Sequence, residues 1–136
     1  MEAHHERAIV RAFFVPGERA RYLNLLSTAR GRKKFVSGLS HLDALGSRFV
    51  RRLGPWEQDV DGIESLLKER GAPTLCYLVS ENPRLDLQRM KLHDALRATV
   101  GSGMDTFLSR ITGQLAYFEG EEPGSRYICE RENPAG

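Results

Sequence analysis

Cysteine is scarce in this sequence, and its two copies lie far apart. Cys76 and Cys129 each sit in an apolar, strand-like segment, and no CxxC or Cys/His spacing accompanies them. A disulfide framework or a metal-binding thiol cluster normally shows such a spacing. We therefore expect two reduced, buried thiols.

Long hydrophobic runs and leader-like features are also missing. No stretch approaches about 18 apolar residues, the length that a membrane helix needs. The first fifteen residues contain acids and lack both a long apolar core and a small-residue cleavage site. We expect a cytoplasmic protein that makes no membrane contact.

The motifs of common catalytic and metal sites are absent too. The sequence contains no HExxH, no Walker lysine motif, no GxGxxG and no EF-hand loop, and His41 and His93 stand singly. No Ser or Cys has an identifiable base beside it in the sequence. These gaps predict no metal and no cofactor, and they leave open whether the protein is an enzyme.

Charge is present but unevenly distributed. Residues 1–55 hold eleven Lys and Arg against four Asp and Glu, whereas residues 56–136 hold nine against fourteen. The first part thus carries +7 and the second −5. Such asymmetry indicates either a surface for nucleic acid or another polyanion, or two halves that face each other or a second copy.

The pattern of apolar residues predicts one α+β domain over residues 1–136, with α/β as the alternative. A basic, mostly helical part (1–55) precedes a sheet-rich part (72–131). We expect a mixed sheet of about five strands in the order β-α-α-α-β-α-β-β-β, ending in an antiparallel meander. The 75–79 strand, the 92–100 helix and the 106–112 strand have the length of a parallel crossover unit. The strands are expected at 8–15, 75–79, 106–112, 115–121 and 125–131, and the helices within 18–53, 59–71 and 92–100.

Trp56 follows the Gly54-Pro55 pair that ends the long helical region. We expect its ring to pack over the junction of the helices. The last strand is expected to be a sheet edge, available for pairing with a second copy in a homodimer.

A polar cluster follows the strand at 75–79. Ser80, Glu81 and Asn82 combine a hydroxyl, a carboxylate and an amide at the end of a buried strand, where open sheets bind ligands. Glu81 has the chemistry of a general base. The alternative is a plain strand exit, since Ser, Asn and the following proline satisfy backbone groups in turns.

Two further residues are candidates for the same site. His93 opens the helix after this strand, and Arg110 lies among apolar residues in the 106–112 strand. Arg110 either pairs with a carboxylate, for which Glu119 on the next strand is the expected partner, or binds an anion.

A basic block forms the second candidate site. If a helix runs through it, Arg30, Lys33, Ser37 and His41 share one face. Rows of this kind contact phosphates, although no helix-turn-helix, RRM or KH signature appears, and a solvated helix face is the alternative. The candidate polyanion-binding residues are Arg30, Arg32, Lys33, Lys34, Arg48, Arg51 and Arg52.

Three functions therefore stay open. The first is a small binding or regulatory module without catalysis. The second is a protein that binds nucleic acid or another polyanion through residues 30–52. The third is a small enzyme with a site near Glu81, His93 and Arg110, which requires that these three share a pocket.

Overall fold

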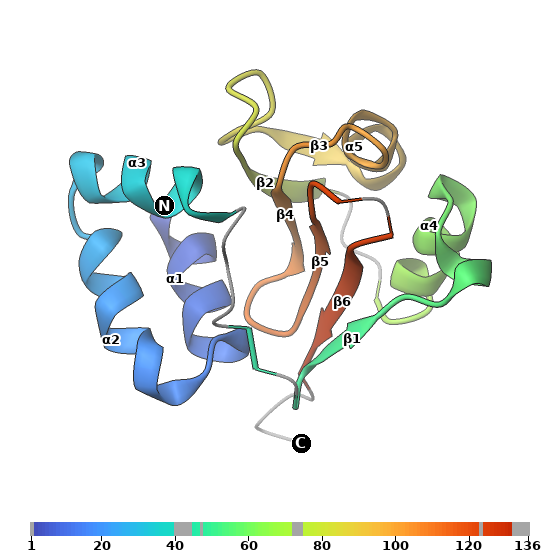
Figure 1. The fold of residues 1–136 in the computed structure, drawn as a ribbon. Helices are drawn as coiled ribbons and strands as arrows, with labels where there is room; N and C mark the ends of the chain where they lie inside the picture. The colour runs from blue at the N-terminus through green and yellow to red at the C-terminus, as the bar shows by residue number, and fades with distance from the viewer. Residues whose placement is uncertain (1, 40–44, 47, 72–74, 123, 132–136) are drawn as a thin grey trace.

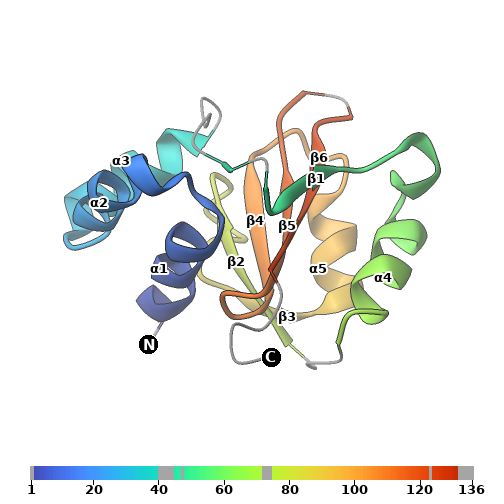
Figure 2. The same cartoon turned by 90° about the horizontal axis from the view of Figure 1, so that it is seen from below.

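The structure is a computed structural model that describes residues 2–39, 45–46, 48–71, 75–122 and 124–131. It places one sheet between two layers of helices (Figures 1 and 2). In the described part of the chain, no helix has both the length and the apolar character needed to cross a membrane. His41, part of the expected basic row, lies outside the described residues.

Three helices cover one face of the sheet: α1 (Glu2–Phe13), α2 (Pro16–Leu25) and α3 (Ala29–Ser37). The strand expected at 8–15 is therefore wrong. Its β-branched and aromatic residues favoured a strand, but Glu6, Ile9, Val10 and Phe13 are buried at helical spacing. Pro16 does not end a strand; it occupies the first turn of α2, where a missing N–H costs nothing.

Two helices cover the opposite face: α4 (Val60–Lys68) and α5 (Leu92–Thr99). The α4 helix begins as expected, because the side chain of Asp59 accepts a hydrogen bond from the Gly62 N–H at 2.7 Å. Ahead of it, the short 3₁₀ helix η2 (Pro55–Glu57) carries Trp56. The expectation for this ring is wrong, since Trp56 is 92% exposed.

The sheet has six strands in the order β1-β6-β5-β4-β2-β3, one more than the expected five. Each described pairing is antiparallel, including that between β2 and β4, so the expected parallel crossover is wrong. The additional strands are short: β1 lies inside the expected helical region, and β3 precedes α5. The strands are β1 (Val50–Arg52), β2 (Leu75–Ser80), β3 (Arg89–Lys91), β4 (Thr106–Ile111), β5 (Leu115–Glu119) and β6 (Arg126–Glu130).

The edges of the sheet also differ from expectation. The last strand, β6, is not an edge, because β1 pairs with it through Val50 opposite Cys129 and Arg52 opposite Tyr127. The edges are β1 and β3. β3 and β4 flank β2, and both run antiparallel to it. The two strands that α5 connects therefore run in the same direction, with β2 between them.

Side-chain alternation along the strands supplies two cores. In β2, Tyr77 and Val79 pack with the α1–α3 layer, whereas Cys76 and Leu78 pack with α4 and α5. In this way one strand contributes to both layers, which explains why its sequence is apolar throughout.

Candidate functional site

The polar cluster after β2 forms a tightly bonded strand exit. The hydroxyls of Ser80 and Thr106 lie 2.7 Å apart, and the Asn82 N–H donates to the Ser80 hydroxyl at 3.0 Å. The Asn82 side-chain oxygen in turn accepts from the Arg84 N–H at 3.0 Å. Ser80 and Asn82 therefore make the contacts that the turn alternative predicts.

An ion network links this exit to two helices. Arg32 of α3 donates to both carboxylate oxygens of Asp86, at 2.7 and 2.9 Å, and its Nε donates to Glu6 of α1 at 2.7 Å. Asp86 also accepts from the Ser80 N–H at 3.0 Å. The hydrogen bonds to Asp86, together with those to Glu6, raise the pKa of Arg32 above its ordinary value. Arg32 therefore holds α1, α3 and the loop after β2 together.

Glu81 lies against a second carboxyl group, that of Asp105. The Glu81 N–H donates to the Asp105 carbonyl at 3.0 Å, and the Asp105 carboxylate accepts from the Glu121 N–H at 3.0 Å. Asp105 is only 2% exposed. Glu81 Oε1 and Asp105 Oδ2 are both buried and have no donor among the described residues. A proton on the Glu81 carboxyl can supply a donor to Asp105.

Burial, and then the side-chain contact with Asp105, raise the pKa of Glu81 to about 7. The negative charges of Asp105 and Glu121 act in the same direction. A second negative charge at this point of the sheet is unfavourable, so the Glu81 carboxyl keeps its proton to a higher pH than usual. This end of the sheet thus carries a carboxyl group that changes protonation near neutral pH.

A groove of about 250 Å³ lies between α3 and this strand exit. It brings together residues from both candidate sets: Arg32 and Lys33 come from the basic block, and Ser80 and Glu81 from the polar cluster. The remaining lining residues are Val36, Ser37, Pro83 and Asp86.

His93 and Arg110 lie elsewhere. His93 is exposed on α5, and its Nδ1 lies 2.7 Å from Glu64 Oε1 of α4. Arg110 is next to Ser109, and Ser109 is opposite Tyr77 at one end of the β2–β4 pair. Glu81 is next to Ser80, at the other end of this pair. The structure therefore does not place Glu81, His93 and Arg110 in one pocket.

The expected pair between Arg110 and Glu119 is wrong. Arg110 donates to the Gly71 carbonyl at 3.0 Å and approaches the Cys76 sulfur at 3.8 Å. Glu119 is opposite Thr106, at the far end of the hairpin, where the Arg126 Nε donates to it at 3.2 Å. The two residues share a face of the sheet but not an end.

The basic candidates divide into two groups on different elements. Arg30, Lys33 and Lys34 are exposed on α3. At β1, the Arg51 Nη1 donates to Glu57 at 3.1 Å and the Arg52 Nε to the Gly124 carbonyl at 3.1 Å. The Arg48 guanidinium lies 5.2 Å from the centre of the adjacent Phe49 ring. The seven residues therefore do not form one continuous row.

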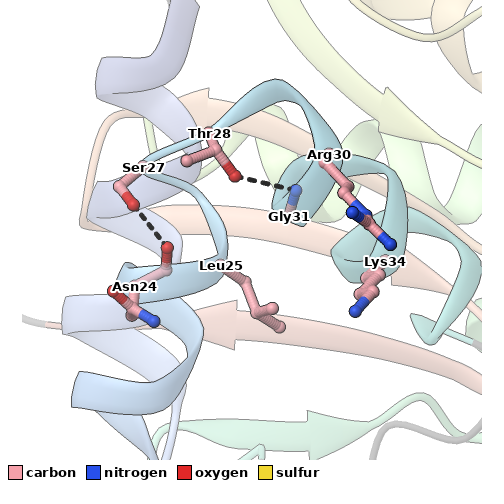
Figure 3. A pocket seen from close by; sticks show the side chains of 7 residues that line it. All are labelled: Asn24, Leu25, Ser27, Thr28, Arg30, Gly31 and Lys34. Atoms are coloured by element: carbon pink, nitrogen blue, oxygen red, sulfur yellow. Dashed lines mark hydrogen bonds between the residues drawn. The ribbon is translucent and has the colours of Figure 1, made fainter.

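A second hollow, of about 330 Å³, lies where α2 meets α3 (Figure 3). The Thr28 hydroxyl caps α3 by accepting from the Gly31 N–H at 2.9 Å. A Cβ on Gly31 would lie 2.0 Å from the Leu25 carbonyl oxygen, so this approach of the two helices requires glycine. Arg30 and Lys34 extend from α3 at the rim of this hollow.

Sequence reasoning missed three of the acids that matter here, Glu6, Asp86 and Asp105. No pattern in the sequence indicated Glu6 and Asp86, because their common partner Arg32 lies far from both along the chain. Asp105 had a weak signal: it directly precedes a buried strand, after the Gly101–Gly103 loop.

Metal binding finds no support in the described ranges, where no group of three or more His, Cys, Asp or Glu is arranged to hold an ion. Comparison with known proteins adds no assignment: no family model, no curated protein and no solved structure matches this chain.

Proposed function

We propose that the protein is a small binding or regulatory module without catalytic activity, and that a small polar anion binds in the groove between α3 and the end of β2. One observation carries this proposal. Two residue sets selected separately from the sequence, Arg32 with Lys33 and Ser80 with Glu81, line the same groove. The separation of His93 and Arg110 from Glu81 favours binding over the enzyme alternative.

The chemistry of the groove favours an anion. Arg32 is already bound to Glu6 and Asp86, so the exposed ammonium of Lys33 and the hydroxyl of Ser37 are the groups that a ligand meets first. Glu81 is protonated below about pH 7 and then carries no charge that would repel an anion. Above that pH it becomes a carboxylate and repels an anion. Binding should therefore weaken as the pH rises from 6 to 8.

The test uses thermal shift and calorimetry with inorganic phosphate, citrate and a nucleoside monophosphate as probes, at pH 6 and pH 8. Lys33→Met should abolish the shift, because Lys33 lines the groove. Lys34→Met is the matched control, since Lys34 is the next residue of α3 but lines the other hollow. Equal losses in the two variants, or no binding of any probe at pH 6, would contradict the proposal.

A second candidate, binding of nucleic acid or another polyanion, is favoured by the exposure of Arg30, Lys33 and Lys34 on one helix. Fluorescence anisotropy of a labelled RNA and a labelled duplex DNA, from low to physiological salt, tests it. Each phosphate contact contributes close to one unit to the slope of log affinity against log salt. Binding that survives physiological salt and loses slope in Lys34→Met would support this candidate over the groove.

We further propose a cytoplasmic location, supported by Cys76 and Cys129 being free and buried. Formation of a homodimer also stays a proposal, and the edges available for it are β1 and β3. Sedimentation of the purified protein across a concentration series tests it directly.

A further inference from the structure

Strand β1 leaves one side of its backbone open. The Glu130 N–H donates to the Phe49 carbonyl at 2.8 Å, and the Leu53 N–H donates to the Arg126 carbonyl at 2.8 Å. In an antiparallel pair the backbone groups of alternate residues point to the same side. Phe49, Arg51 and Leu53 therefore bond to β6, and Val50 and Arg52 direct their N–H and C=O groups away from the sheet.

β1 is the terminal strand of the sheet, and the backbone of Val50 and Arg52 has no hydrogen bond outside the β1–β6 pair in the described ranges (Figure 1). An open edge of this kind is a template for an added strand. Proteins protect such edges with short strands, charged side chains, proline, bulges or covering segments. β1 is short and contains Arg51 and Arg52, which disfavour a strand without acidic residues, and it contains no proline.

Shortly after β1 along the chain comes the most exposed large apolar side chain of the described residues, Trp56. Tryptophan is costly to leave in water and is enriched at the centres of protein interfaces. A groove of about 510 Å³ adjoins it, to which β1 contributes Arg52. The other lining residues are Leu53, Pro55, Gln58, Gly124 and Arg126.

The positive charge of β1 favours a different protein over a second copy of this chain as the partner at this edge. The segment 48–52 contains three arginines and no acid. If β1 of two copies paired antiparallel about a twofold axis at Arg51 or Arg52, that arginine would lie opposite the same arginine of the other copy. Like charges opposite each other destabilise a strand pair. An acidic strand gains from the same arginines, because the exposed pair between Arg51 and Glu57 contributes little and exchanges easily.

We propose that β1 is the docking edge for an extended acidic segment of a partner protein. The segment adds a strand beside Val50 and Arg52, pairs carboxylates on one face of the sheet with Arg52, and covers Trp56. This surface lies at the β1 edge, whereas the ligand groove lies between α3 and the loop after β2. It is therefore independent of the proposed small-molecule site.

Trp56 makes the test direct, because it is the only tryptophan of the chain. The probe is a capped heptapeptide that alternates Glu and Val, added to the full chain at low and physiological salt. We expect a saturable blue shift of the tryptophan emission and reduced quenching by acrylamide. A peptide that alternates Glu and Pro has the same charge but cannot form a ladder, and it should give neither change.

Two charge reversals localise the effect. Arg52→Glu should weaken binding about tenfold or more, since it replaces an attraction by a repulsion. Arg30→Glu makes the same change at an exposed position of α3 and should leave the affinity within about twofold. Both positions are exposed, and circular dichroism verifies that both variants fold.

Three outcomes would overturn the proposal. Equal binding of the Glu-Val and Glu-Pro peptides would show attraction without strand pairing. Equal weakening by Arg52→Glu and Arg30→Glu would show a diffuse effect of net charge. Sedimentation as a dimer, with Trp56 already protected from acrylamide before peptide is added, would assign the edge to a second copy.

Discussion

Replacing Glu81 with glutamine should make the protein more stable above neutral pH and leave it unchanged in acid. The pKa of Glu81 rises from 4.5 to about 7 in the folded chain, chiefly through burial and then through the side-chain contact with Asp105. Between these two values the folded state binds more protons than the unfolded state. The free energy of unfolding therefore falls as the pH rises from about 4.5 to about 7, and levels off above it.

The size of the effect follows from the shift. Each pKa unit corresponds to about 1.4 kcal/mol, which sets an upper limit of about 3.4 kcal/mol. Because Glu81 is partly exposed, solvent screens the repulsion, and about 1 to 2 kcal/mol is expected. The glutamine amide adds no charge and can donate a hydrogen bond to Asp105 Oδ2, which has no donor among the described residues.

Urea denaturation at pH 5, 6, 7 and 8 measures this difference. Far-ultraviolet circular dichroism is the suitable signal, because Trp56 is exposed in the folded state and its emission changes little on unfolding. Glu122→Gln is the control, as it removes an exposed carboxylate from the loop that follows β5. If the stability difference between the wild type and Glu81→Gln is the same at pH 5 and pH 8, the raised pKa of Glu81 is refuted.

Three other predictions follow from buried or strained positions. Arg32→Met should lower the free energy of unfolding by about 2 to 3 kcal/mol, because it leaves the buried carboxylate of Glu6 without its partner; urea denaturation of the variant checks this. Cys76 and Cys129 should not react with a thiol reagent at pH 8 until urea is added. Burial raises the pKa of both thiols, that of Cys129 to about 12. The chromophore that the reagent releases on reaction measures how many thiols have reacted. Gly113→Ala should cost about 1 kcal/mol, because Gly113 has a φ of 71°; a lower melting temperature would show it, and an unchanged one would contradict the argument.

Local sequence patterns correctly predicted those helices and strands in which the buried residues recur at one regular spacing. The α4 helix has acids near its start and apolar residues at helical spacing, and β2, β4 and β5 are short apolar runs with turn residues beside them. The pattern failed where composition and spacing disagree: residues 8–13 have the composition of a strand but the spacing of a helix. It also failed at β1, which forms only because β6 lies beside it.

The same limit applies to the candidate site. Glu81 could be selected from the sequence, because it follows a buried strand. Its partner Asp105 could not be assigned, since the two acids meet only through the pairing of β2 with β4. The ion network around Arg32 depends on where three separate segments lie, and a basic run such as residues 30–34 looks the same in sequence whether or not one of its members is buried in an ion pair.

The order in which the layers appear along the chain has a consequence for synthesis. The α1–α3 layer carries Ile9, Phe13, Phe14 and Phe35, yet the strand residues that cover them, such as Val79 and Phe118, come much later. The β1 strand likewise waits for β6, which is synthesised much later. During translation the basic N-terminal helices therefore have an apolar face with nothing to pack on. This face can be covered only after β2 and β5 are made, and until then it is the surface that a chaperone would bind.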